Sequence, residues 1–351
     1  MGAARGLMVC WRIPGVCVLL GVALAAAPAR AGGIKDADLS LRLPAALTRF
    51  APYADVAAVG GASAASKWSS SVNPASVAWQ PIPGTLHLSF SPQYADILFR
   101  EGTELHIASE AVTLDTGCAG TLQPALAQVW SNRATTRQGL DFGIDMDFAQ
   151  VQWATRISND WAVGANFNYA KSHTQFDLLD MPVSDSHSDA YGWRFGVLRR
   201  LTDRLLAGIV GDYGFSRDRT VVHDFLGLGV GDIGISDTTH QFAVRPGVSY
   251  EYAKDSAVYA DYQFAAFRND TGRLHVNRFF MGVDHAITKG LFVRGGAALD
   301  TCGNASWTTG IGIYPSDRIS IDIAYQQNMF PELEREFGRS QTLTVSLGFT
   351  F

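Results

Sequence analysis

The sequence is poor in cysteine and lysine, and beyond its N-terminus it has no long hydrophobic run. Cys10 and Cys17 lie in an N-terminal segment that we expect to be removed, so two of the four cysteines remain in the mature chain. No later apolar segment is long enough for a membrane-spanning helix. The net charge is -5 and there is no basic cluster, which argues against a nucleic-acid partner.

Recognisable catalytic and metal-binding motifs are also missing. The eight histidines are scattered, with no His-x-His or Glu-x-x-His spacing, and no Gly-x-Ser-x-Gly motif occurs. We therefore expect no enzymatic activity, no cofactor and no metal site. The sequence leaves one alternative open, because a serine and a histidine from distant segments can converge in a folded chain.

The N-terminus has the three parts of a secretory signal peptide. A charged region is followed by an apolar core at residues 16–27 and by a small-x-small cleavage pattern at residues 29–31. The charged region holds Arg5 and Arg12. We expect residues 1–31 to be removed, and no cysteine follows the cleavage site, which argues against lipoprotein processing.

The last stretch, residues 340–351, alternates strictly between apolar and small polar residues. Its apolar face consists of Leu343, Val345, Leu347, Phe349 and Phe351, and it carries no charge. An unprotected apolar strand at the end of a soluble protein invites aggregation. The pattern favours a strand that closes a barrel in lipid by pairing with the first strand. A strand in the core of a soluble sandwich is the alternative.

Similar alternating runs continue back to Leu140, joined by two kinds of connection. Short polar turns at 158–160, 202–204, 254–256, 288–290 and 315–317 alternate with longer connections at 177–188, 223–239, 268–273, 300–304 and 328–339. Short turns at one rim and long loops at the other are typical of outer-membrane barrels. With less regular runs between residues 85 and 112, the sequence predicts an all-β, transmembrane antiparallel barrel at 84–351 with roughly 12 to 14 strands.

If the apolar faces meet lipid, charged residues of both signs point into the lumen. Their charges are then expected to neutralise one another, since unpaired buried charges are costly. Inward glycines (Gly164, Gly192, Gly196, Gly208, Gly282 and Gly312) leave room for something inside. The predicted polar network of the lumen consists of Asp145, Arg194, Arg245, Glu251, Asp261, Asp284, Arg294 and Asp322.

Residues 32–83 lack strand alternation and are rich in small residues, which suits either a periplasmic linker or a plug inside the barrel. The segment contains Asn73-Pro74-Ala75 shortly before the first strand. The chain here resembles the FadL/OmpP1 (TodX-like) family of outer-membrane transporters of hydrophobic compounds. Pro246-Gly247, followed by an aromatic strand with an inward Asp261, is similar to the C-terminal half of that family. The resemblance implies a hatch inside the barrel, to which we assign Phe50, Trp68, Asn73, Pro74 and Ala75.

The resemblance also implies a function. Family members take up hydrophobic molecules passively, so we expect small hydrophobic partners, contact with outer-membrane lipids and lipopolysaccharide, and a monomer. The break that Pro246 and Gly247 would cause in a hydrogen-bonded ladder is a candidate lateral opening, or a simple bulge. A partner-binding module associated with secretion and a general porin are the alternative functions.

The two mature cysteines, Cys118 and Cys302, raise the question of a disulfide. Counting strands from the C-terminus places both on the rim with long loops, with Cys118 in a long connection at residues 115–139. Export permits a bridge between them, and such a bridge would tie that loop across the mouth.

Overall fold

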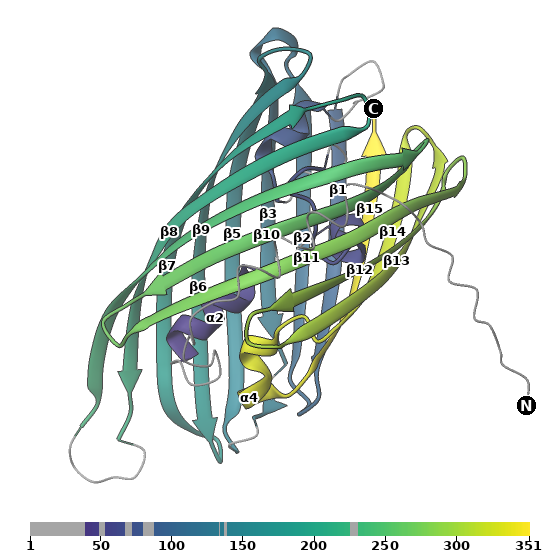
Figure 1. Ribbon diagram of the computed structural model, residues 1–351. Coiled ribbons are helices and arrows are strands. Elements are labelled where there is room, and N and C mark those ends of the chain that lie inside the picture. The colour runs from purple at the N-terminus through teal and green to yellow at the C-terminus, as the bar shows by residue number, and fades with distance from the viewer. Residues whose placement is uncertain are drawn as a thin grey trace, which may run out of the picture. The chain divides into compact units, whose positions relative to one another are not determined.

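The computed structural model of the chain describes residues 39–48, 53–66, 72–79, 88–132, 134–136, 139–224 and 231–351 (Figure 1). The expected signal peptide, Phe50 and Trp68 lie outside these residues. Within them, the strands form one antiparallel sheet that closes on itself, because β3 pairs with both β2 and β5. The short β4 pairs with β5 beyond the end of β3, so the described wall has 14 strand positions. The predicted antiparallel barrel is confirmed.

The strands follow one another around the wall in sequence order. The last strand, β15, pairs with β1 and closes the ring, as its uncharged alternating pattern predicted. The strands are β1 (Leu88–Phe99), β2 (Glu104–Asp115), β3 (Thr121–Ser131), β4 (Ala134–Thr135), β5 (Asp141–Arg156), β6 (Trp161–Leu178), β7 (Met181–Arg200), β8 (Leu205–Val222), β9 (Ile233–Ala253), β10 (Ser256–Arg268), β11 (Arg273–Thr288), β12 (Leu291–Asp300), β13 (Ala305–Ser316), β14 (Ile319–Gln327) and β15 (Ser340–Thr350).

The two rims of the barrel are named here by their connections. The turn rim, uppermost in Figure 1, holds the C-terminus and the connections 116–120, 157–160, 201–204, 254–255, 289–290 and 317–318. The loop rim holds the connections 100–103, 132–140, 179–180, 223–232, 269–272, 301–304 and 328–339. The last of these contains two short helices, η4 (Pro331–Leu333) and α4 (Glu334–Phe337).

Two of the predicted loops are wrong. Residues 177–188 are mostly strand, because β6 and β7 meet in a two-residue turn at Leu179 and Asp180, which have φ of 51° and 63°. Residues 115–139 contain β3, which was missed because Pro124 and small residues weaken its alternation. The missed strand β3 moves the connection that precedes it to the opposite rim.

The possible disulfide between Cys118 and Cys302 is absent, and β3 is the reason. Cys118 lies on the turn rim in a 3-10 turn between β2 and β3, whereas Cys302 lies on the loop rim between β12 and β13. The height of the wall separates them, and both are free, exposed thiols. A disulfide requires the two Cα atoms to lie within about 7 Å of each other.

The outer face changes character between the two rims. On β6, Trp161 and Phe167 are exposed near the turn rim, whereas Lys171 follows on the same face toward the loop rim. The boundary is marked by Tyr169 and Tyr191, whose ring centroids lie 5.2 Å apart. An apolar outer band bordered by aromatic rings is typical of a barrel that spans a membrane.

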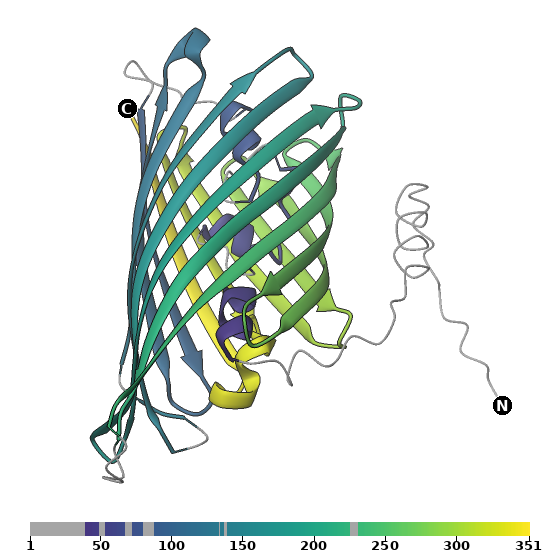
Figure 2. The same ribbon diagram turned by 90° about the vertical axis from the view of Figure 1, so that its left-hand side faces the viewer.

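Three helical segments precede the wall and lie within the ring of strands (Figure 2). Helix α2 (Leu39–Leu47) contacts β10, β11 and η4, and α3 (Ala54–Ala58) contacts β12 to β15. The 3-10 helix η2 (Pro74–Trp79) contacts β3, β5, β6 and β7. In the part of the chain that the structure describes, no helix is both long enough and apolar enough to cross a membrane.

Candidate functional site

The turn-rim half of the lumen is filled by residues 53–66 and 72–79, which we call the lumen segment. This segment is built of small residues, and Ala57, Ala58, Ala62 and Ala64 have no exposed surface. Small side chains allow its backbone to lie directly against the wall. The segment follows the inner circumference of the barrel from η2 on one side to α3 on the other.

A row of inward glycines accepts the lumen segment. A Cβ at Gly208 would collide with the backbone of Ala64, and a Cβ at Gly282 would collide with Val59. The wall therefore requires glycine where the segment passes. Seven strands from β6 to β13 contribute glycines that touch the segment in this way: Gly164, Gly196, Gly208, Gly247, Gly282, Gly296 and Gly310.

The strongest polar fastening of the lumen segment is an ion pair between β9 and β10. Arg245 and Asp261 are buried, and Arg245 Nη2 lies 2.9 Å from Asp261 Oδ2. The same carboxylate oxygen accepts hydrogen bonds of 2.8 Å from the backbone amides of Ser63 and Ala64. Arg245 also donates to the carbonyl of Gly61. We call these four contacts the clamp. In the clamp, the Arg245–Asp261 ion pair of the wall binds two backbone amides and one backbone carbonyl of the segment.

Neutral side chains of the wall add further hydrogen bonds to the segment. Thr308 Oγ1 donates to Ala58 O at 2.8 Å, Gln326 Nε2 to Ala57 O at 3.2 Å, and Ser249 Oγ to Ala65 O at 2.9 Å. These bonds tie three backbone carbonyls of the segment to the wall, and Ala57 O accepts a second hydrogen bond from Gly60 N.

The Asn73-Pro74-Ala75 motif lies at the η2 end of the lumen segment. Asn73 is fully buried, and its Nδ2 donates to Ala64 O at 2.6 Å and to Val197 O of β7 at 3.1 Å. Its Oδ1 accepts from the amide of Ala75 at 3.0 Å. Asn73 therefore joins two parts of the lumen segment to the wall, while Pro74 packs against Gly164 and Gly196.

A second group of charges surrounds Arg294 of β12. Its guanidinium contacts Asp284 Oδ2 at 3.1 Å, Tyr314 Oη at 2.8 Å and the carboxylate of Asp322. Asp55 of α3 approaches this group from the lumen. Burial, followed by the negative charge of Asp322, raises the pKa of the Asp55 carboxyl to about 7.

The remaining residues of the predicted polar network divide into inward and outward positions. Arg194 faces the lumen and pairs with Asp212, and Glu251 faces it near the turn rim. Asp145 does not, and its predicted position is wrong. On β5 the neighbouring Phe142 and Ile144 are buried inside the barrel, so Asp145 is exposed on the outer face. This part of β5 lies beyond the apolar band, where water rather than lipid meets the wall.

The loop-rim half of the lumen contains an apolar cluster that the sequence did not predict. Phe337 of α4 packs against Phe99 and Phe142, with ring centroids 5.4 and 4.9 Å apart. The cluster also draws on α2 through Leu39, Leu43 and Ala46. Its other buried members are Ala95, Ile97, Ile107, Ile144, Met329, Phe330 and Leu333.

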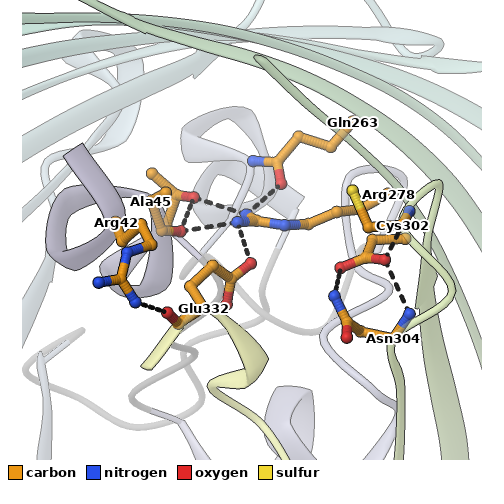
Figure 3. Close-up of polar contacts among 9 residues, drawn as sticks. Arg42, Ala45, Gln263, Arg278, Cys302, Asn304 and Glu332 are labelled. Carbon is orange, nitrogen blue, oxygen red and sulfur yellow. Dashed lines mark hydrogen bonds and ion pairs between the residues drawn. The ribbon is translucent and has the colours of Figure 1, made fainter. Parts of the chain in front are cut away.

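Two buried arginines fasten α2 beside this cluster (Figure 3). Arg278 of β11 is fully buried and donates to Ala45 O at 2.8 Å, to Thr48 Oγ1 at 2.7 Å and to Glu332 Oε1 at 2.7 Å. Arg42 of α2 binds both carboxylate oxygens of Glu336 at 2.6 Å. The helix is therefore tied both to the wall and to residues 328–339. The single Arg in an apolar helix was the available signal, but its partner lies 294 residues away.

The candidate lateral opening at Pro246 and Gly247 is a local interruption of the wall. Between β9 and β10 the paired residues run to Gly247 and resume at Val244, so Arg245 and Pro246 have no Cα partner there. Pairing with β8 is continuous through Pro246. A similar interruption leaves Ser91 and Pro92 of β1 without partners on β15. Both prolines lack the amide hydrogen that a ladder needs.

Little free space remains between the lumen segment and the wall. A cavity of about 10 Å³ lies there, lined by Gly60, Phe280, Ala298, Ser306, Thr308, Gln326 and Met329. This is room for roughly one water molecule. The lumen segment and the wall are therefore in close contact at this place.

No family model and no curated protein matches this sequence. Solved structures share its fold. The CymD monoaromatic hydrocarbon channel aligns with a TM-score of 0.58 at 13% identity, over 84% of this chain and 96% of that one. The toluene transporter TbuX of Ralstonia pickettii gives 0.53 at 12% identity, over 80% and 92%. A FadL homologue of Pseudomonas aeruginosa gives 0.51 at 13% identity, over 80% and 93%. At these identities the likeness establishes the fold, which is the FadL-type barrel that the sequence predicted.

Proposed function

We propose that this barrel of the FadL type is an outer-membrane channel for the passive uptake of hydrophobic compounds, and that residues 32–83 form a hatch that closes it. The observation that carries the proposal is the clamp of Arg245 and Asp261 on the lumen segment. A segment held in the lumen by buried polar contacts, with an apolar cluster toward the loop rim, suits a gated passage better than an open pore. Solved proteins of this fold are described as a hydrocarbon channel and a toluene transporter.

The proposed path begins at the loop rim. A hydrophobic compound partitions from water into the apolar cluster around Phe99 and Phe337, because burying its apolar surface is favourable. Further movement requires the lumen segment to shift, which means breaking the clamp. The compound then leaves at the turn-rim end or sideways, where Pro246 interrupts the β9–β10 ladder.

Several accompanying proposals follow from this function. The signal peptide at 1–31 is removed on export, and residues 84–351 form the barrel in contact with outer-membrane lipids and lipopolysaccharide. We propose that the barrel acts as a monomer, because a wall that closes on itself is complete within one chain. We also propose that it has no catalytic activity, in keeping with solved proteins of this fold that are described as a channel and a transporter. Long-chain fatty acids and hydrocarbons are the proposed substrate classes, since an apolar site discriminates weakly among similar chains.

The test compares the full-length mature protein with a variant lacking residues 33–80 in planar lipid bilayers. We expect the full-length protein to be closed to ions and the variant to conduct, because removal of the segment empties the turn-rim half of the lumen. Uptake of radiolabelled toluene into proteoliposomes supplies the transport readout, and we expect the full-length protein to admit it faster than protein-free vesicles do.

Three other outcomes would change the conclusion. Equal conductance of the two proteins would contradict the proposed hatch and favour a general porin. A closed deletion variant that admits no toluene would favour a partner-binding role. Conductance only in the deletion variant, with no toluene uptake by the full-length protein, would support a plug in the lumen but contradict the proposed transport of hydrophobic compounds.

A further inference from the structure

The outer face of the β6–β7 hairpin carries two histidines and an aspartate in contact with one another. His173 and His187 are Cα partners across the two strands, and their rings stack with centroids 4.5 Å apart. Asp185 Oδ1 lies 2.7 Å from His173 Nε2 and 3.3 Å from His187 Nδ1. One carboxylate oxygen therefore lies beside both imidazole rings.

This spacing matches what a metal ion requires. One donor atom from each of the three side chains lies within 4.8 Å of the other two. Zinc binds imidazole nitrogen and carboxylate oxygen at about 2.0–2.2 Å, which places the donors of a tetrahedral site about 3.3 Å apart. Small rotations of exposed side chains convert the observed distances into that arrangement. The side chains of His173 and His187 are 42% and 61% exposed, so a metal ion can reach them from solvent.

We propose that His173, Asp185 and His187 form a binding site for a divalent transition-metal ion such as Zn²⁺. Two imidazoles with one carboxylate favour zinc, copper or nickel over calcium and magnesium, which prefer sites made of oxygen alone. Three protein ligands leave at least one coordination position for water or another ligand.

Neighbouring charges of both signs surround the cluster. Asp145 of β5 is the Cα partner of His173, and Arg219 of β8 is the Cα partner of His187. Asp145 adds negative charge beside the site, whereas Arg219 opposes a cation at its other edge. No histidine motif marks the site in the sequence, because its ligands come from two strands and meet only through their register.

The position of the site gives it a structural role. Beyond Tyr169 and Tyr191 the hairpin no longer has an apolar outer face, and its inner face carries small polar residues such as Ser172 and Ser188. Strands that are polar on both faces specify their register weakly. A metal ion that joins β6 to β7 would fix the register of the hairpin at the loop rim.

The experiment is a calorimetric Zn²⁺ titration of the full mature protein in detergent micelles, after treatment with EDTA and its removal. We expect one saturable binding event in the wild type. His173→Ala and His187→Ala should each weaken it at least tenfold, and Asp185→Asn should weaken it as well. Heat-modifiable migration on SDS gels verifies that every variant is folded.

His106→Ala is the matched control. His106 Nδ1 lies 3.2 Å from Asp96, so the two form another histidine–aspartate pair on the outer face, but in the described part of the chain they are not grouped with a second imidazole. We expect this variant to bind Zn²⁺ as the wild type does. The proposal is overturned if the wild type shows no saturable event, or if His187→Ala and His173→Ala bind as tightly as the wild type.

Discussion

The two halves of the barrel bury opposite kinds of side chain. In the turn-rim half the outer face is apolar, and the lumen holds glycines, hydrogen-bonding side chains and the clamp. In the loop-rim half the outer face of the long strands β5 to β8 is largely polar, and the lumen holds the apolar cluster around Phe337. A single strand shows both arrangements, since β5 exposes Trp153 near one rim and buries Phe142 near the other. The medium outside the wall therefore decides which face of a strand is apolar.

Breaking the clamp of the turn-rim half is expected to have the largest effect. Arg245→Ala leaves the Asp261 carboxylate buried without its cation, which costs about 3–5 kcal/mol. The lumen segment should loosen, so ion conductance in planar bilayers should rise above the wild-type level. Arg194→Ala is the control, because the Arg194–Asp212 pair is partly exposed. Equal conductance in the two variants would mean that the clamp holds nothing in particular.

In the loop-rim half, the corresponding substitution removes packing contacts from the apolar cluster. Phe337→Ala removes a buried ring from the apolar cluster, which costs about 3–5 kcal/mol at most and less where the site collapses. Urea unfolding in lipid vesicles, followed by tryptophan fluorescence, measures it. Phe195→Ala, on the outer face and 62% exposed, should cost less. If it costs as much, the contrast between inner and outer faces is not what stabilises the barrel.

A smaller effect is expected where α2 is tied to residues 328–339. Glu336→Gln keeps the shape of the side chain but removes the charge that Arg42 binds, and a hydrogen bond to a charged group contributes about 1.5–3 kcal/mol. Amide hydrogens of α2 should then exchange faster. Glu334→Gln provides the comparison, since its partner Arg339 is exposed. Unchanged exchange in Glu336→Gln would show that the wall alone holds α2.

Fastening of the lumen segment should also depend on pH through Asp55. The pKa of this carboxyl is raised to about 7 inside the barrel, so the packed segment binds the proton more tightly than the released segment does. The segment is therefore held most firmly below about pH 4, and its hold weakens as the pH rises through about 7. Conductance should increase between about pH 4 and about pH 7 and change little above that range. Asp55→Asn should remove this increase, and a variant that keeps it would exclude Asp55 as the cause.

The smallest effect is expected on the outer face of the loop-rim half. Asp145→Asn changes an exposed charge that faces water, so stability should stay within about 0.5 kcal/mol of the wild type. The same urea titration measures it. Asp261→Asn, inside the turn-rim half, should be far more destabilising. Similar losses in both variants would show that Asp145 faces inward after all.

The wall could be predicted because its signal is local. Each apolar outward residue of β15 indicates contact with lipid without reference to distant residues. Turns such as residues 254–255 likewise require residues that adopt particular backbone conformations. Local sequence patterns gave wrong predictions where the medium outside the wall changes from lipid to water, as at Asp145, or where Pro124 weakens the alternation of β3. An error of one strand was enough to bring Cys118 to the wrong rim.

The interior could be predicted only in part. The inward glycines indicated that something lies within the barrel, because glycine on a strand face marks a close approach. The partners of Arg42 and Arg278 could not be inferred, since Glu336 and Glu332 lie in a polar stretch that resembles a solvated loop. Pairs so far apart in sequence leave no periodic pattern.

The seam between β1 and β15 sets an order of assembly. Ser89 pairs with Thr350, so the ring cannot close until the last strand has arrived. The lumen segment precedes β1 in the chain and lies inside the closed ring. Pairings between the two ends of a chain form slowly. We therefore expect the wall to be wrapped around its contents during biogenesis, and a chain that loses β15 to expose both the segment and two unpaired sheet edges.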